Sequence, residues 1–335
     1  MKIGLFAKPG LIPHLLLERI NHLAPGSGHL FDWTPGTGRL LLDADHVVWN
    51  DQPLTGFDRM WIHGFSYANP VIPDATLQRD WSVWQVDYLS HQQEYSALFS
   101  LFEELDRRGV TLFNPPRIHL GQSMKFALLE GFRASGFQVP ALLCSNDMEN
   151  VDLFCREMST VVWRPATGRA AWQLFQKKQR KALIDPNKPP VLLAEGISGP
   201  LMRGYLLNGQ MILCLQHSPP QHTPPMESLG DLWSVSCAEQ AAPLQRLAQE
   251  WGVAWAVITF VPSSSGPWIY DLDPDPLLDW LPIPFRDFLL TCLAETLTGR
   301  DHTAIAPQLD QERPTLFLRR LLKILFELEH SKYVR

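Results

Sequence analysis

Apolar and polar positions follow two different periods in the first third of this chain. Short apolar runs with the length of buried strands alternate with stretches whose apolar residues recur every three to four positions, as on one face of a helix. The predicted order is strand 2–6, helix 13–23, strand 57–62, helix 88–108 and strand 110–113. Gly109 stands where the second helix needs a C-cap. This order predicts a parallel sheet flanked by helices over residues 1–115.

The next two blocks of the chain are richer in strands. For residues 116–195 the pattern predicts helix 122–135, strand 141–144, a helix ending at 158, strand 160–164, a returning strand 171–175 and strand 190–195. For residues 196–282 it predicts a hairpin of 202–208 and 210–216, helix 241–251 and a second hairpin over 255–273. The turn of the first hairpin is Asn208-Gly209, a strong hairpin signal. The stretches 69–84 and 217–231 show no clear period and are predicted to be loops.

Residues 283–335 contain two apolar-rich helix candidates, 284–297 and 315–328. The second carries three basic residues beside its leucines, which is typical of a packing helix with a solvated face. Docking to a partner or to a membrane surface is the alternative interpretation.

Composition limits the classes of protein to which the chain belongs. It has 335 residues, 45% of them hydrophobic, a net charge of −6 and scattered basic residues, so a basic stripe for nucleic acid is absent. No apolar run reaches the roughly 18 residues needed to cross a bilayer, and the first residues lack the apolar core of a signal peptide. Five cysteines without C-x-x-C spacing indicate buried thiols of a cytoplasmic protein, not a disulfide frame or a zinc site.

Two acids at the end of the second hairpin are the first candidate for chemistry. Asp271 and Asp273 lie two residues apart in a predicted strand, so their side chains point to the same face. Two carboxylates on one face form a natural site for a hard cation such as Mg²⁺, which in turn holds phosphate oxygens. The alternative is a surface hairpin whose acids are solvated. The eleven histidines, among them His63, His217 and His222, show no metal-ligand spacing.

Several polar residues precede these acids in an order that suits a polyphosphate. Lys125 and Arg164 would neutralise phosphate oxygens, Glu195 ends a strand as a hinge carboxylate, and Arg203 starts the next strand. The local sequences around them can be compared with known motifs. Asn114 precedes Lys125 by eleven residues, and Val-Val-Trp-Arg-Pro at 161–165 leads to Gly168. The segment Leu-Ala-Glu-Gly-Ile then ends at Ile197, and Gly199 precedes Arg203. Pro276 follows the two acids.

These motifs in this order resemble the ATP-grasp superfamily. The similarity is to the branch with the ribosomal-protein S6 glutamate ligases and the ligases that cyclise microviridin-type (graspetide) precursor peptides. It implies an α/β (α+β) fold with four parts: a parallel-sheet pre-ATP-grasp domain (1–115), a central ATP-grasp subdomain (116–195), a C-terminal ATP-grasp subdomain (196–282) and a helical extension (283–335).

The resemblance also implies roles for the residues. ATP would be bound by Lys125, Arg164, Gly168, Glu195 and Ile197, with Arg164 and Arg203 acting on the transferring phosphoryl group and the acyl-phosphate. Asp271 and Asp273 would hold Mg²⁺. The implied function is an ATP-dependent ligase that joins a carboxylate to an amine, on a peptide, a protein or an amino acid; a second copy of the chain stays open as a further partner.

The chain departs from the family pattern at the site itself. Arg164 replaces the strand lysine, and Leu201 stands where the family has an aspartate. The family's D-x₁₁-E-x-N signature falls on Thr259, Asp271 and Asp273, so the first metal carboxylate is lost and the asparagine becomes an acid. Two alternatives therefore stay open: a degenerate ATP-grasp protein that binds a nucleotide or a peptide as a scaffold without turnover, and an unrelated α/β protein.

Overall fold

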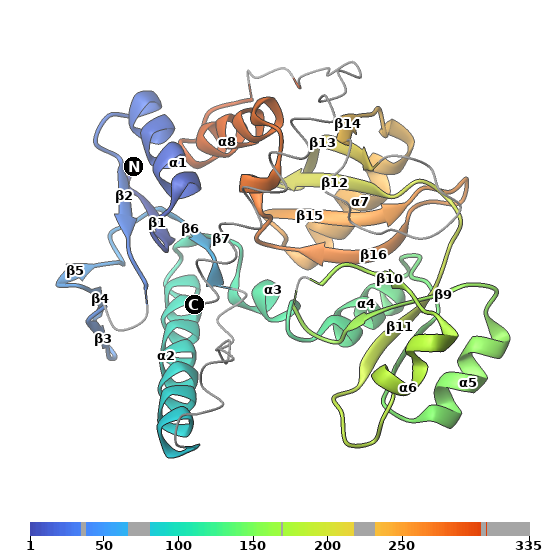
Figure 1. Cartoon of the computed structure of the whole chain (residues 1–335). Helices are drawn as coiled ribbons and strands as arrows, with labels where there is room; N and C mark the ends of the chain where they lie inside the picture. The colour runs from blue at the N-terminus through green and yellow to red at the C-terminus, as the bar shows by residue number, and fades with distance from the viewer. Residues whose placement is uncertain (35–37, 66–80, 169, 218–231, 303–305, 307–335) are drawn as a thin grey trace, which may run out of the picture.

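The computed structural model describes residues 1–34, 38–65, 81–168, 170–217, 232–302 and 306. Within them, four sheets are covered by helices, which confirms the predicted α/β class. Figure 1 shows the N-terminal sheet with α1 and α2, the C-terminal sheet beside it, and the central sheet with α5 and α6 adjoining the C-terminal one. No helix in the described ranges is both long and apolar enough to cross a bilayer. The division into subdomains at 115, 195 and 282 stays a prediction.

The N-terminal sheet is parallel, as predicted, with strand order β2-β1-β6-β7. Because side chains alternate along a strand, β1 sends Ile3 and Leu5 to the face covered by α1 and Phe6 to the face covered by α2. The elements are β1 (Ile3–Ala7), α1 (Leu11–Leu23), β2 (Gly28–Phe31), β6 (Arg59–His63), α2 (Trp81–Arg107) and β7 (Thr111–Phe113).

Two features of this region differ from the sequence prediction. Helix α2 begins at Trp81 and not at residue 88, so residues 81–84, predicted as loop, are helical. The prediction missed this start because apolar residues such as Val86 and Leu89 are exposed and do not mark a buried face. A small antiparallel sheet was not predicted, since its strands of two or three residues are too short for a period. Its strands are β3 (Leu40–Leu42), β4 (Val47–Trp49) and β5 (Gln52–Pro53).

The central sheet is antiparallel, with strand order β10-β9-β11-β8. Val151 of α5 packs on one face with Val161 and Leu193, and Leu129 of α4 packs on the other face with Leu192. The elements are α3 (Pro116–Leu120), α4 (Lys125–Ala134), β8 (Leu142–Ser145), α5 (Met148–Glu157), β9 (Val161–Pro165), β10 (Gln173–Leu174), η3 (Lys177–Gln179), α6 (Arg180–Leu183) and β11 (Val191–Glu195).

The C-terminal sheet is also antiparallel and faces two cores. Its order is β14-β13-β12-β15-β16, and the predicted hairpin turns at Asn208 and Gly209, both with positive φ. One face packs on α7 and α4, and the other packs on α8, which lies against α1 (Figure 1). The elements are β12 (Met202–Leu207), β13 (Gln210–His217), β14 (Leu232–Ser234), α7 (Ala238–Trp251), β15 (Trp255–Val261), β16 (Trp268–Asp273), η4 (Leu278–Trp280) and α8 (Ile283–Leu297). The predicted helix 315–328 and most of the predicted loops 69–84 and 217–231 lie outside the described residues.

Asn114 joins the N-terminal sheet to the C-terminal sheet. It follows β7 and is completely buried. Its Oδ1 accepts hydrogen bonds from the backbone N–H groups of Ala254 and Trp255, both at 2.8 Å. Its Nδ2 donates to the carbonyls of Trp255 (2.5 Å) and Pro274 (2.9 Å). One amide side chain therefore satisfies four backbone groups, three of them in the buried residues Trp255 and Pro274 and one in the part-buried Ala254 just before β15.

We predict that Asn114→Ala destabilises the protein strongly, because it leaves these backbone groups buried without their partner. Each such group costs about 1–3 kcal/mol, so the free energy of unfolding should fall by at least about 3 kcal/mol in urea titrations. Asn187→Ala is the control, since Asn187 is exposed and bonds only within its own turn. Equal stability of the two variants would contradict this account.

Candidate functional site

Asp271 lies between two buried cations. It is on β16, while Lys125 is the first residue of α4 and Arg164 is on β9; the two basic side chains are each 1% exposed. Lys125 Nζ donates to Asp271 Oδ1, and Arg164 Nη1 donates to Oδ2 at 2.7 Å. Lys125 Nζ also donates to the carbonyl of Leu272 at 3.0 Å. The structure thus brings together three predicted site residues that are far apart in the sequence.

The surroundings keep Asp271 ionised. Burial alone would raise the pKa of this carboxyl group, but the charges of Lys125 and Arg164 and their hydrogen bonds outweigh burial and lower the pKa below its usual value. For Lys125, burial is the largest influence and lowers the pKa of the ammonium group, with Asp271 acting against it. Lys125 and Arg164 share the Asp271 carboxylate, and the nearby charge of Asp273 also acts to raise the pKa of Lys125, so the two cations face two carboxylates.

The second predicted acid lies on the same face of β16. Asp273 Oδ1 accepts hydrogen bonds from Gln122 Nε2 (2.9 Å) and from the backbone N–H of Asp275 (3.0 Å). In the sheet, Arg203 of β12 is paired with Thr259 of β15, and Thr259 is paired with Asp271. Arg203, Thr259 and Asp271 therefore form one row across three strands.

The loop after β9 is fixed to the same cluster. Gly168 has a positive φ of 78°, which favours glycine. Its carbonyl accepts a hydrogen bond from Arg164 Nη2 (2.5 Å), and its N–H donates to the carbonyl of Gln122 (3.0 Å). Gln122 in turn bonds Asp273 through its side chain. This chain of hydrogen bonds places the predicted glycine loop over the charged residues.

The predicted hinge residues Glu195 and Ile197 are joined by a tyrosine. The hydroxyl of Tyr270 donates to the Glu195 carbonyl and accepts from the Ile197 N–H, both at 2.7 Å. Tyr270 is 1% exposed, and burial raises the pKa of its hydroxyl group. Trp172 packs edge-on against its ring at 5.8 Å and donates to its carbonyl. A carbonyl and an N–H two residues apart are what the edge of an adenine ring needs, and here Tyr270 bonds both.

Sequence reasoning missed Asp275, which is 1% exposed. Its two oxygens lie 2.5 Å from His63 Nδ1 and 2.6 Å from the Gly64 N–H, and the His63 ring stacks on Trp61. The alternation Asp271, Asp273, Asp275 was the available signal, although Pro274 interrupts the strand. Gln122, Trp172 and Tyr270 were missed as well, because nothing in their local sequence distinguishes them from core residues.

The oxygen donors at this site fit a hard divalent cation. Mg²⁺ is usually bound by oxygen ligands, with water and phosphate completing its shell. Asp271 and Asp273 offer carboxylates here, and Thr259 offers a hydroxyl group. Both oxygens of Asp271 are bonded to Lys125 and Arg164. A cation would therefore have to exchange with these two side chains.

Solved structures share this fold. The ATP-grasp ligase PsnB complexed with a minimal precursor superposes with a TM-score of 0.68 at 17% identity, over 90% of this chain and 99% of that one. The macrocyclase MdnC bound with precursor peptide MdnA from Microcystis aeruginosa gives a TM-score of 0.66 at 15% identity, over 89% of this chain and 100% of that one. A Chryseobacterium gregarium RiPP-associated ATP-grasp ligase in complex with ADP and a leader and core peptide gives a TM-score of 0.65 at 13% identity, over 91% of this chain and 99% of that one.

No family model and no curated protein matches the sequence. The likeness is thus one of fold: the chain shares the ATP-grasp fold of these solved structures, as the resemblance implied.

We predict that Asp271→Asn lowers the free energy of unfolding at pH 7 by about 3–5 kcal/mol, the usual cost of leaving buried charges without their partner. Because folding lowers the pKa of Asp271, its contribution is present above the unfolded pKa of about 4 and is lost as pH falls below it. The difference between wild type and variant in urea titrations should therefore shrink below pH 4. Asp279→Asn, at an exposed acid, is the control; equal stability of the two variants would contradict the prediction.

Proposed function

We propose that this chain is an ATP-dependent ligase that joins a carboxylate to an amine, on a peptide or an amino acid. The observation that carries the proposal is the buried Asp271 carboxylate held by Lys125 and Arg164 beside Asp273, in an ATP-grasp fold. PsnB has been solved with AMPPNP and a precursor peptide, and with Mg and ADP. These complexes support ATP, Mg²⁺ and a peptide as partners. The free state of all five cysteines fits the cytoplasmic location included in this proposal.

Binding of ATP begins with an exchange of partners at Asp271. Lys125 and Arg164 transfer their hydrogen bonds from this carboxylate to phosphate oxygens, which carry more negative charge. Asp271 is then available, together with Asp273, to hold Mg²⁺ against the phosphates. The exchange keeps every buried charge paired, so it avoids the cost of an isolated ion.

The remaining predicted residues position the nucleotide and the reacting groups. Glu195 and Ile197 offer their backbone carbonyl and N–H to the adenine once Tyr270 releases them, and Gly168 lies over the phosphates. ATP transfers its γ-phosphoryl group to the substrate carboxylate and leaves as ADP. The amine then attacks the resulting acyl-phosphate, forms the amide bond and displaces phosphate. Lys125 and Arg164 stabilise the charge on the transferring group, and Arg203, one strand from Thr259, binds the acyl-phosphate.

A second function is a scaffold that binds a nucleotide or a peptide without turnover. Two observations favour it. Thr259 offers a neutral hydroxyl where the family has a metal carboxylate, and the Tyr270 hydroxyl takes both hinge hydrogen bonds. Both functions share the fold and differ in whether phosphoryl transfer occurs.

Calorimetry of ATP binding with and without Mg²⁺ tests the proposal. We predict binding that requires Mg²⁺ and is lost in Asp271→Ala/Asp273→Ala, because these carboxylates hold the cation. Asp279→Ala, which changes an exposed acid soon after β16, should bind like the wild type.

Turnover separates the two functions. ADP release with Mg²⁺ and a panel of acidic peptides should be detectable for the ligase, absent in Lys125→Ala and retained in Lys177→Ala, which removes an exposed lysine. ATP binding without ADP release on any peptide of the panel would favour the scaffold. Absence of ATP binding by the wild type would overturn both nucleotide-dependent functions.

Tyr270→Phe probes the hinge. The change removes the hydroxyl group that bonds Glu195 and Ile197 but keeps the ring. We predict that ATP binds about tenfold more tightly to this variant, because the nucleotide no longer displaces two hydrogen bonds of about 1 kcal/mol each. The gain is less than the sum of the two bonds, since in the wild type the displaced hydroxyl regains part of that energy by bonding to water. Tyr205→Phe, at another buried tyrosine of the same sheet, is the control. Unchanged affinity in the Tyr270 variant would mean that adenine does not use these two atoms.

A further inference from the structure

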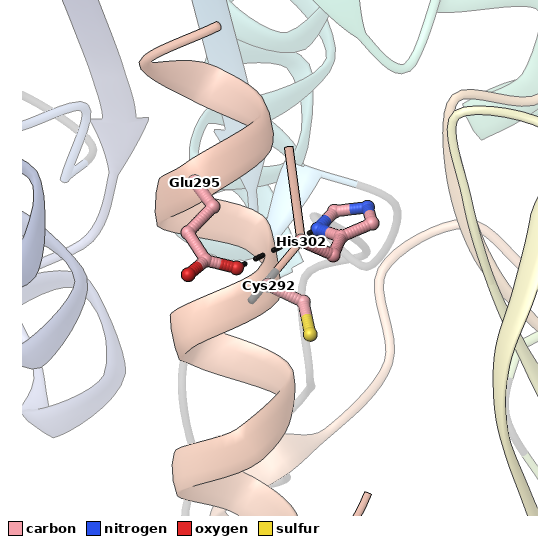
Figure 2. A group of neighbouring side chains, drawn as sticks. All are labelled: Cys292, Glu295 and His302. Carbon is pink, nitrogen blue, oxygen red and sulfur yellow. Dashed lines mark ion pairs between the residues drawn. The ribbon is translucent and has the colours of Figure 1, made fainter. Parts of the chain in front are cut away.

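A second cluster of polar side chains lies at the end of α8, away from the residues that the proposed ligase uses. Cys292 and Glu295 are three residues apart on the helix, and His302 follows it (Figure 2). One ligand atom from each of the three lies within 4.8 Å of the others. Among the described residues, this is the one group in which three histidine, cysteine or carboxylate ligand atoms lie so close together. Cys292 is 1% and Glu295 4% exposed, while the His302 side chain is 26% exposed.

The turn after α8 brings His302 back over the helix. Gly299 has a φ of 72°, its N–H donates to the Thr296 carbonyl (3.0 Å), and the Arg300 N–H donates to the Glu295 carbonyl (2.8 Å). This is the pattern of hydrogen bonds that ends a helix at a glycine and reverses the chain. Figure 2 shows the His302 ring beside the last turn, with one ring nitrogen directed to Glu295.

Hydrogen bonds assign the tautomer of His302. The hydroxyl of Thr296 donates to the Cys292 carbonyl at 3.0 Å, so its oxygen has lone pairs left to accept. His302 Nε2 lies 3.4 Å from that oxygen and donates to it. In neutral His302 the Nδ1 atom then carries a lone pair, and it faces Glu295 Oε2 at 3.7 Å. Two acceptor atoms therefore face each other at a distance that a shared cation can bridge.

The donors match Zn²⁺ better than Mg²⁺. A thiolate, an imidazole and a carboxylate are the three ligand types of protein zinc sites, with bonds of about 2.0–2.3 Å. In a tetrahedral site these bonds place ligand atoms about 3.5 Å apart, close to the 3.7 Å between Glu295 and His302. Two negative ligands balance the charge of the ion, and the end of a helix dipole favours a cation.

The geometry points to a Zn²⁺ site formed by Cys292 Sγ, Glu295 and His302 Nδ1, with water as the fourth ligand and Thr296 positioning the imidazole through Nε2. Burial and the charge of Glu295 raise the pKa of the Cys292 thiol to about 12, so binding displaces a proton from sulfur to solvent. The ion would tie the segment after α8 to a helix that also packs on α1.

Titration of the chelator-treated full chain with Zn²⁺ alone tests the site. Calorimetry should give one ion per chain, and the midpoint of thermal unfolding should rise. Cys292→Ser and His302→Gln should each weaken binding by more than about 100-fold, beyond what loss of an outer-shell partner costs. Thr296→Val should weaken it about 10- to 100-fold through the orientation of His302. Cys155→Ser, on α5, and His46→Gln, at an exposed histidine that bonds Asp43, should bind like the wild type.

Two further readouts make the result unambiguous. Co²⁺ in place of Zn²⁺ should give a thiolate charge-transfer absorption that is missing in Cys292→Ser. Zinc binding should persist in Asp271→Ala/Asp273→Ala, so failure of the ligase proposal would leave this one standing. Zinc binding that is weak in all proteins alike, or unchanged in Cys292→Ser and His302→Gln, would overturn the site and leave an ion pair between Glu295 and His302.

Discussion

The charge on Asp271 is the constraint on which the candidate site depends. Lys125 and Arg164 are buried from solvent, and two cations in such surroundings are tolerated only with a partner. Asp271 supplies that partner from a third element, so one carboxylate joins α4, β9 and β16. The central sheet and the C-terminal sheet are thereby held together at the place where a ligand would enter between them.

Side chains on both faces of strand β16 form bonds with residues of the central sheet or the segment that follows it. Successive side chains on a strand point in opposite directions. Asp271 therefore meets the two cations on one face, while Tyr270 meets the backbone of Glu195 and Ile197 on the other. A nucleotide that uses both the cations and the hinge must replace both sets of bonds.

The elements with a clear period were predictable, and so was the order of charged residues along the chain. The parallel sheet followed from alternating strands and helices, and Lys125, Arg164 and Asp271 followed from their resemblance to a family. Contacts between distant segments were not predictable. His63 and Asp275 are 212 residues apart and meet only after two sheets are packed. Cys292 was expected to be an ordinary buried thiol, because C-x₂-E-x₆-H is not a familiar spacing of metal ligands. Only the turn at Gly299 brings the three residues together.

The substitutions at the proposed metal site move charge without removing it. The family pattern places one acid on the strand of Thr259 and one at Asp271, whereas this chain has both on β16, at Asp271 and Asp273. A cation held by these two acids would lie away from β15 and towards Gln122, which bonds Asp273 and, through its carbonyl, the loop at Gly168. The metal would thus contact the network that holds the phosphate loop. In the proposed ligase, Asp273 would supply the charge that Thr259 lacks, two residues beyond Asp271 on β16.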